Sequence, residues 1–184
     1  MGFVRPPTPL RRVSAPPDEE VDPSNLDAIF RRFAPYVARI AGRVLGQWQE
    51  VDDVVQDVFL DAYRGLRGLR DPSAVRHWLA TVTVRKARRR LARRRMMRWL
   101  GLDAPLDLND VPDAVASADG RAQVLSIYRI LDRVSPDARI AWVMHRVEDQ
   151  PLEVVAEVCG CSRATAHRRV REAQAALEKG LNDD

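Results

Sequence analysis

The 184-residue chain has little of what marks a secreted, membrane-spanning or disulfide-bonded protein. Its two cysteines, Cys159 and Cys161, are too few for a disulfide framework. No apolar run approaches the roughly 20 residues that cross a bilayer. The first 23 residues contain no apolar block of the kind that forms a signal peptide. These absences favour a cytoplasmic protein.

Lysine is also rare: only two of the 30 basic residues are lysine, and the rest are arginine. The planar arginine fork suits phosphates and guanine edges, although a GC-rich genome would also favour arginine. We find no phosphate-cradling glycine loop and no nucleophile with a plausible base. We therefore expect neither enzymatic activity nor a cofactor.

Apolar residues recur at helical spacing and no strand pattern of any length occurs, so we expect an all-α fold. Proline and glycine punctuate an acidic stretch with five aspartates and no basic residue, which indicates a flexible linker. The predicted organisation is a disordered leader at 1–23, a helical module at 24–98, the acidic linker at 99–121 and a second helical module at 122–184.

The first module has clear helix signals. Ser24 is placed to cap a first helix, which Pro35 would kink or split. A second helix over 51–66 has one apolar side, and Asp71 with Pro72 marks the start of a third. The expected buried residues of the second helix are Val54, Val55, Val58, Phe59 and Ala62.

The second module ends in a helix-turn-helix pattern. Ser135 and Pro136 start one helix, Gly160 supplies a positive φ at a tight turn, and Ser162 caps the last helix. Four small apolar residues would pack the last two helices together: Ala156, Val158, Ala166 and Val170. The second of these helices is basic, as in helices that enter a major groove, although a helical hairpin with a solvated basic face would give the same pattern.

Charge is distributed unevenly along the chain. Residues 24–98 hold 17 basic and 7 acidic residues, whereas 125–184 hold 9 basic and 10 acidic ones. Eight of the eleven residues over 85–95 are basic, and we expect this charge to be locally uncompensated and available to a polyanion. A frayed, merely solvated helix end is the alternative.

An acidic face on the second helix has no electrostatic reason to meet DNA. Asp53, Gln56 and Asp57 share one side at spacings of three and four, which suits docking to a basic protein surface. Solubility alone is the competing explanation.

Three stretches resemble two regions of a known family. "EVDDVVQDVFLDAYRGL" with "HWLATVTVRKARRRLARRR" looks like the second region of bacterial sigma factors. "SPDARIAWVMHRVEDQPLEVVAEVCGCSRATAHRRVREAQAAL" looks like their fourth region. A linker in place of a third domain is the layout of the extracytoplasmic-function (ECF) group, so the resemblance implies an alternative sigma factor that binds core RNA polymerase and promoter DNA.

The resemblance also implies residue roles. Asp53, Gln56 and Asp57 would contact a coiled coil of the largest polymerase subunit, and the loop 70–75 would capture a flipped base. Trp78 would support the opening of the −10 element or belong to the core. The residues implied at the −10 element are Arg76, His77, Trp78, Arg85, Lys86, Arg88 and Arg89. Those implied at the −35 element are Arg163, Thr165, His167, Arg168 and Arg171. The linker would thread toward the polymerase active-site cleft, and an anti-sigma partner is expected.

Other hypotheses make different demands. A stand-alone helix-turn-helix regulator would not need the acidic face, and a nuclease would need metal-binding carboxylates near the basic run. Cys159 and Cys161 with His145 or His167 would make a metal site, but cysteines in a helical hairpin are more often small buried apolar residues. We expect no metal.

Overall fold

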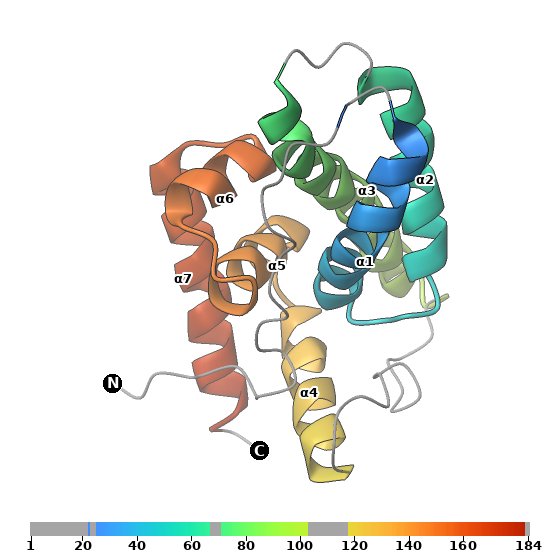
Figure 1. Cartoon of the computed structure of the whole chain (residues 1–184). Coiled ribbons are helices and arrows are strands. Elements are labelled where there is room, and N and C mark those ends of the chain that lie inside the picture. The colour runs from blue at the N-terminus through green and yellow to red at the C-terminus, as the bar shows by residue number, and fades with distance from the viewer. Residues whose placement is uncertain (1–21, 23–24, 67–70, 103–117, 183–184) are drawn as a thin grey trace.

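The computed structural model describes residue 22 and residues 25–66, 71–102 and 118–182, and these form helices with no strand, as expected (Figure 1). All of the leader except residue 22, and most of the linker, lie outside the described residues. The elements are α1 (Leu26–Leu45), α2 (Val51–Gly65), the 3-10 turn η3 (Pro72–Ala74), α3 (Val75–Trp99), α4 (Ala118–Leu131), α5 (Pro136–Trp142), the π-helical turn η5 (Val143–Val147), α6 (Leu152–Cys159) and α7 (Arg163–Gly180).

Helices α1, α2 and α3 pack against one another as the first module. The cap of α1 is Asn25, not Ser24: the Asn25 Oδ1 accepts a hydrogen bond of 3.1 Å from the backbone N–H of Ala28. The helix continues through Pro35 without splitting. The predicted apolar side of α2 is buried, with Val55 partly exposed.

Helices α4 to α7 form the second module, and its local signals are confirmed. Ser135 caps α5 and Ser162 caps α7, each through its hydroxyl. Gly160 has φ +65° at the turn between α6 and α7. The helix predicted to run on from Pro136 does so, but its last five residues are π-helical. The four small apolar residues between α6 and α7 are buried.

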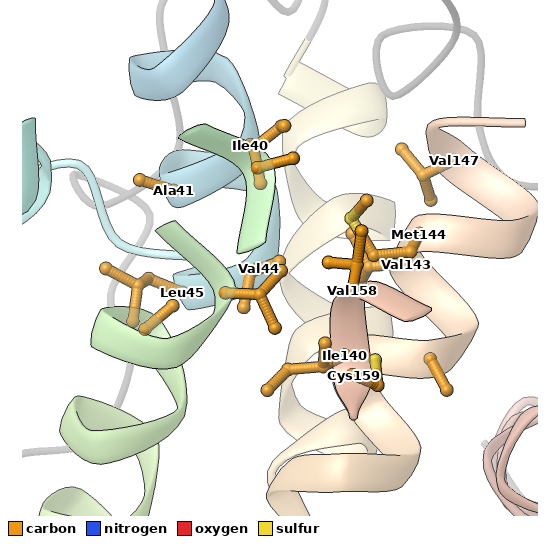
Figure 2. Packing of buried hydrophobic residues seen from close by; sticks show 14 of the residues in the cluster. Ile40, Ala41, Val44, Leu45, Ile140, Val143, Met144, Val147, Val158 and Cys159 are labelled. Atoms are coloured by element: carbon orange, nitrogen blue, oxygen red, sulfur yellow. The ribbon is translucent and has the colours of Figure 1, made fainter. Parts of the chain in front are cut away.

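The two modules share one apolar core. Helix α3 packs against α5 and α6, and α1 packs against η5. Figure 2 shows Ile40 and Val44 of α1 facing Ile140, Val143 and Met144 of the second module. The sequence predicted two modules on a linker and gave no sign that they dock.

Candidate polymerase and nucleic-acid interfaces

The basic run forms the C-terminal part of α3, and much of its charge is compensated within the chain. The Lys86 Nζ lies 2.9 Å from a carboxylate oxygen of Asp61. Arg94 lies 3.1 Å from Glu50 and also donates a 3.0 Å hydrogen bond to the carbonyl of Leu45. The expectation of an uncompensated run is therefore wrong for these cations, because α2 packs alongside α3.

Arg90 joins the basic helix to the acidic face of α2. Its guanidinium lies 3.3 Å from Asp57, 3.5 Å from Glu50 and 3.6 Å from Asp53. Asp53 and Asp57 nevertheless keep 68% and 45% of their side-chain surface exposed, and Gln56 is exposed beside them. The acidic face is thus open to a partner while one arginine holds its carboxylates in place.

An exposed arginine stripe remains on α3. Arg85, Arg89 and Arg93 are exposed and recur every four residues, which places them on one side of the helix. Within the described part of the chain none of the three is ion-paired. A row of exposed guanidinium groups along one helix suits a phosphate backbone.

Arg88 points the other way, into the boundary between the modules. Its Nε lies 2.7 Å from Asp137 of α5, and its Nη2 donates a 2.9 Å hydrogen bond to the carbonyl of Cys159 at the end of α6. Of the four cations assigned to phosphates from the sequence, Arg85 and Arg89 are therefore exposed, whereas Lys86 and Arg88 are engaged within the chain.

The first turns of α3 carry the other residues assigned to the −10 element. The guanidinium of Arg76 lies 5.2 Å from the ring centroid of Tyr36, and the exposed His77 lies 3.8 Å from Glu157 of α6. Trp78 is half-buried against the core and packs closely on Gly65, where a Cβ would lie 2.7 Å from its ring. Such packing holds the indole in place instead of leaving it free in solvent.

Asp71 accepts hydrogen bonds from the Ser73 backbone and hydroxyl, which fixes the turn before α3. This turn belongs to the loop assigned to base capture. The first residue of that loop, Arg70, lies outside the described residues.

The recognition helix of the predicted helix-turn-helix begins at Arg163. Exposed cationic and imidazole side chains line its outer side: Arg163, His167, Arg168 and Arg171. Arg163 lies 2.6 Å from Glu153 of α6, and both side chains are mostly exposed. The Thr165 hydroxyl lies 2.9 Å from that of Ser162. The helix is therefore capped at its base and presents a basic face.

Sequence reasoning missed the buried arginines. Arg43 and Arg139 are 6% and 1% exposed, and Arg139 stands between two buried residues of α5, Ala138 and Ile140. Burial lowers the pKa of Arg139, although the neighbouring Asp132 opposes this shift. A charged residue inside an otherwise apolar helical stretch was the available signal.

The two cysteines have different surroundings. Cys159 is buried, and burial raises the pKa of its thiol to about 11, while Cys161 is half-buried. In the described ranges no three side chains of metal-binding type gather. None of the described helices has the length and apolar character needed to cross a membrane.

Comparison with known families assigns both modules. Residues 29–96 match the family model "Sigma-70 region 2", and residues 125–177 match "Sigma-70, region 4". The chain belongs to the sigma-70 family. The two matched segments occur in the order that the sequence resemblance predicted, and they contain the basic helix and the helix-turn-helix respectively.

Curated relatives place this sigma-70 family member in the ECF group. It is 30% identical to the ECF RNA polymerase sigma factor SigJ of Mycobacterium tuberculosis, over 80% of this chain and 48% of SigJ. It is 25% identical to the ECF RNA polymerase sigma-E factor of Escherichia coli, over 80% of this chain and 81% of that one. The chain thus spans about half the length of SigJ but most of sigma-E.

The fold of this ECF family member is also similar to a solved structure. The match is to the co-crystal structure of the sigma factor RpoE in complex with the anti-sigma factor NepR from Bartonella quintana, with a TM-score of 0.64 and 20% identity. It covers 88% of this chain and 99% of that one. At this identity the likeness shows the fold.

Proposed function

We propose that this protein is an alternative sigma factor that binds core RNA polymerase and directs initiation from promoters with −10 and −35 elements. The observation that carries the proposal is the presence, on one chain of this family, of an open acidic face, a basic helix and a basic helix-turn-helix. A protein that only binds DNA has no electrostatic use for the acidic face.

The polymerase-binding residues in this proposal are Asp53, Gln56 and Asp57. Their exposure supports the assignment, and a basic partner surface would complement the two carboxylates. Arg90 already touches both carboxylates, so polymerase binding would add to an existing ion-pair network.

We assign the −10 element to the α3 side of residues 24–98. Arg85 and Arg89 would contact phosphates directly because both are exposed. Lys86 and Arg88 would first have to leave Asp61 and Asp137. Arg76, His77 and Trp78 would act at the melted edge, with Trp78 as a support held by the core.

We assign the −35 element to residues 122–184, through the exposed side of α7. Arg163, His167, Arg168 and Arg171 would reach base edges and phosphates in the major groove, and Thr165 would lie at the start of the helix. The polymerase performs the chemistry, so this protein would act by binding alone. Its place of action would be the cytoplasm, where the polymerase and the promoter are. The acidic segment 99–121 would enter the polymerase cleft, and an anti-sigma factor would regulate the protein, as NepR binds RpoE.

A reconstituted transcription assay tests the proposal. Purified protein is mixed with sigma-free core polymerase and promoter DNA from upstream of its own gene, and promoter-specific transcripts are expected. Tight specific DNA binding by the protein alone, without polymerase association, would instead identify a stand-alone helix-turn-helix regulator.

A charge-reversed variant tests the acidic face. Asp53→Lys with Asp57→Lys should weaken polymerase binding at least tenfold, because two attractive contacts become repulsive. Asp27→Lys with Glu153→Lys is the charge-matched control, since both carboxylates are mostly exposed and lie on α1 and α6, outside that face. Equal polymerase binding by the double variant and the control would remove the role assigned to this face.

A further inference from the structure

Three large apolar side chains are exposed together where the start of α1 lies beside the end of α2. These residues, Phe30, Leu60 and Tyr63, keep 46%, 58% and 56% of their surface exposed. The ring of Phe30 packs edge-on against Phe59, with 4.8 Å between the ring centroids. Phe59 lies one turn before Tyr63 on α2. Phe30, Leu60 and Tyr63 therefore form an apolar strip across the two helices that is open to solvent.

The apolar strip borders the acidic face of α2. Leu60 follows Gln56 and Asp57 by four and three residues, so it lies on the same side of the helix. Tyr63 lies three residues further on, at the edge where Phe59 touches α1. Aromatic rings beside exposed carboxylates suit a ligand that carries apolar and cationic groups together.

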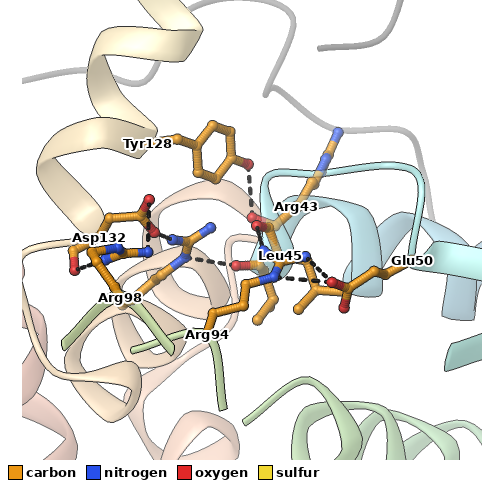
Figure 3. Close-up of polar contacts among 9 residues, drawn as sticks. Arg43, Leu45, Glu50, Arg94, Arg98, Tyr128 and Asp132 are labelled. Atoms are coloured by element: carbon orange, nitrogen blue, oxygen red, sulfur yellow. Dashed lines mark hydrogen bonds and ion pairs between the residues drawn. The ribbon is translucent and has the colours of Figure 1, made fainter. Parts of the chain in front are cut away.

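The helices that carry this surface are held in a fixed relation to each other. Arg94 of α3 donates a 3.0 Å hydrogen bond to the carbonyl of Leu45 at the end of α1, and it lies 3.1 Å from Glu50, the residue before α2 (Figure 3). Several apolar residues of the two helices are buried beneath the surface: Ile29, Phe33, Val58 and Ala62. A preformed surface loses little conformational entropy when it binds a ligand.

The leader contains a segment of matching chemistry. Its stretch "RPPTPLRR", residues 5–12, holds three arginines, three prolines and one leucine and has no acidic residue. Pro6 and Pro9, three residues apart, favour the extended polyproline II conformation, and segments of this kind dock on aromatic-lined surfaces. The prolines and Leu10 would cover the aromatic rings, and the arginine pair after Leu10 would meet the carboxylates.

The leader joins the fold beside this surface. The carbonyl of Asp22 accepts a 3.0 Å hydrogen bond from the backbone N–H of Asn25, the cap of α1. Phe30 lies about one turn into that helix. Pro9 precedes Asp22 by 13 residues, a span of up to about 40 Å in polyproline II, whereas the 15 residues of α2 extend over about 22 Å. The basic stretch can therefore reach every part of the surface.

The acidic residues of the leader are kept apart from the basic stretch. Asp18, Glu19 and Glu20 come shortly before α1 in the chain. The N-terminus of a helix favours negative charge, because its dipole is positive there. Repulsion from the acidic face of α2 acts in the same direction. The stretch 5–12 is thus the part of the leader that suits this surface.

We propose that residues 5–12 of this chain dock on the apolar strip and the adjoining acidic face of α2. Attachment through Asp22 gives the segment an effective concentration in the millimolar range, so a weak contact is enough to hold it there in much of the population. The docked segment covers Leu60 and Asp57, and it then competes with polymerase for one surface. That competition rests on the proposed function, whereas the docking rests on the surface and the leader alone.

Site-specific photo-crosslinking in the full-length chain tests the docking. A benzophenone amino acid replaces Leu10, and mass spectrometry of the irradiated protein locates the cross-links. We expect them at Phe30, Leu60 and Tyr63 or their immediate neighbours. Leu60→Ser should lower the yield at least fivefold, whereas Leu102→Ser, at a leucine that is 67% exposed after α3, should leave it unchanged.

A mixture of isotope-labelled and unlabelled protein distinguishes the chain's own leader from that of a second copy. We expect cross-links within single chains. Cross-links between labelled and unlabelled chains would assign the surface to a second copy and overturn the proposal. Cross-links that avoid α1 and α2, or equal yields from Leu60→Ser and Leu102→Ser, would also overturn it.

Polymerase binding tests the competition. Arg11→Ser with Arg12→Ser should raise the affinity for core polymerase about threefold, since a leader that covers the face in about two thirds of the molecules leaves one third competent. Arg129→Ser with Arg133→Ser removes the same charge from exposed positions in α4 and just after it, and it is the control.

The two readouts fail separately. An affinity that is the same for the leader variant and the control would overturn the competition between leader and polymerase. If the unmutated protein does not bind polymerase at all, the proposed function fails. The docking is then still decided by the cross-links, which need no polymerase.

Discussion

Gly46 offers a sharp test of module docking, because it ends a helix of one module and touches side chains of the other. Its φ is +65°, and a Cβ built on it would lie 2.5 Å from Cδ1 of Tyr128 and 2.8 Å from a guanidinium nitrogen of Arg139. Gly46→Ala therefore adds both a backbone strain and a collision across the module boundary.

The matched control is Gly101→Ala. Gly101 has a similar φ of +71°, and a Cβ there would have no atom within 4 Å. A left-handed conformation costs an L-residue about 1–2 kcal/mol. Both variants carry this backbone penalty, so it cancels when their stabilities are compared. Overpacking of a well-packed site costs about 1–3 kcal/mol more. The difference between the variants isolates the collision with Tyr128 and Arg139.

Thermal unfolding by calorimetry is the assay. For a chain of this size about 1 kcal/mol lowers Tm by roughly 2–4 °C. We expect Gly101→Ala to lower Tm by about 2–8 °C at most, and Gly46→Ala to lower it by a further 2–12 °C or to split the transition into two. Equal transitions for both variants would mean that Tyr128 and Arg139 do not pack on Gly46 in solution, and docking would be refuted.

Other contacts give further predictions. Arg89→Ala should reduce the slope of log K against log salt for promoter binding by about one, whereas Arg90→Ala should leave that slope unchanged because its contacts are with α2. Stability should fall between pH 10 and 12, because burial raises the pKa of Tyr128 from 10 to about 12 and only the unfolded chain loses this proton there. Tyr128→Phe should flatten that part of the profile of Tm against pH, and an unchanged profile would contradict the burial. A thiol reagent at pH 8 should modify Cys161 quickly and Cys159 slowly, since burial raises the pKa of Cys159 to about 11. Equal rates for the two thiols would show that Cys159 is accessible.

Local signals account for what the sequence predicted well. Ser135 and Ser162 cap their helices because a hydroxyl reaches an N–H three residues ahead, a geometry that depends only on neighbours. The same holds for the positive φ of Gly160. At the start of α1 two adjacent residues offered suitable side chains, and Asn25 took the position assigned to Ser24.

The contacts that the sequence did not predict are ion pairs between residues far apart in the chain. Arg90 and Arg94 meet Glu50 some 40 residues earlier in the chain, and no periodicity within either helix encodes that register. The direction of Arg88 likewise depends on where α5 and α6 lie. The shared exposed side of Asp53, Gln56 and Asp57, and the exposed basic side of α7, could be predicted because each set of residues lies on a single helix.

The boundary between the modules has an apolar part and a polar part, and the two contribute differently to docking. The apolar part stabilises the docked arrangement, because separating the modules would expose apolar surface to water. Burying Glu148 with Arg43 costs desolvation that roughly offsets the attraction between them. These groups would regain water if the modules came apart, so the ion pair adds specificity to docking with little net free energy. The ion pair between Arg88 and Asp137 differs from that of Glu148, because a phosphate could replace Asp137 as the partner of Arg88. The apolar contacts of the shared core therefore supply most of the free energy of docking.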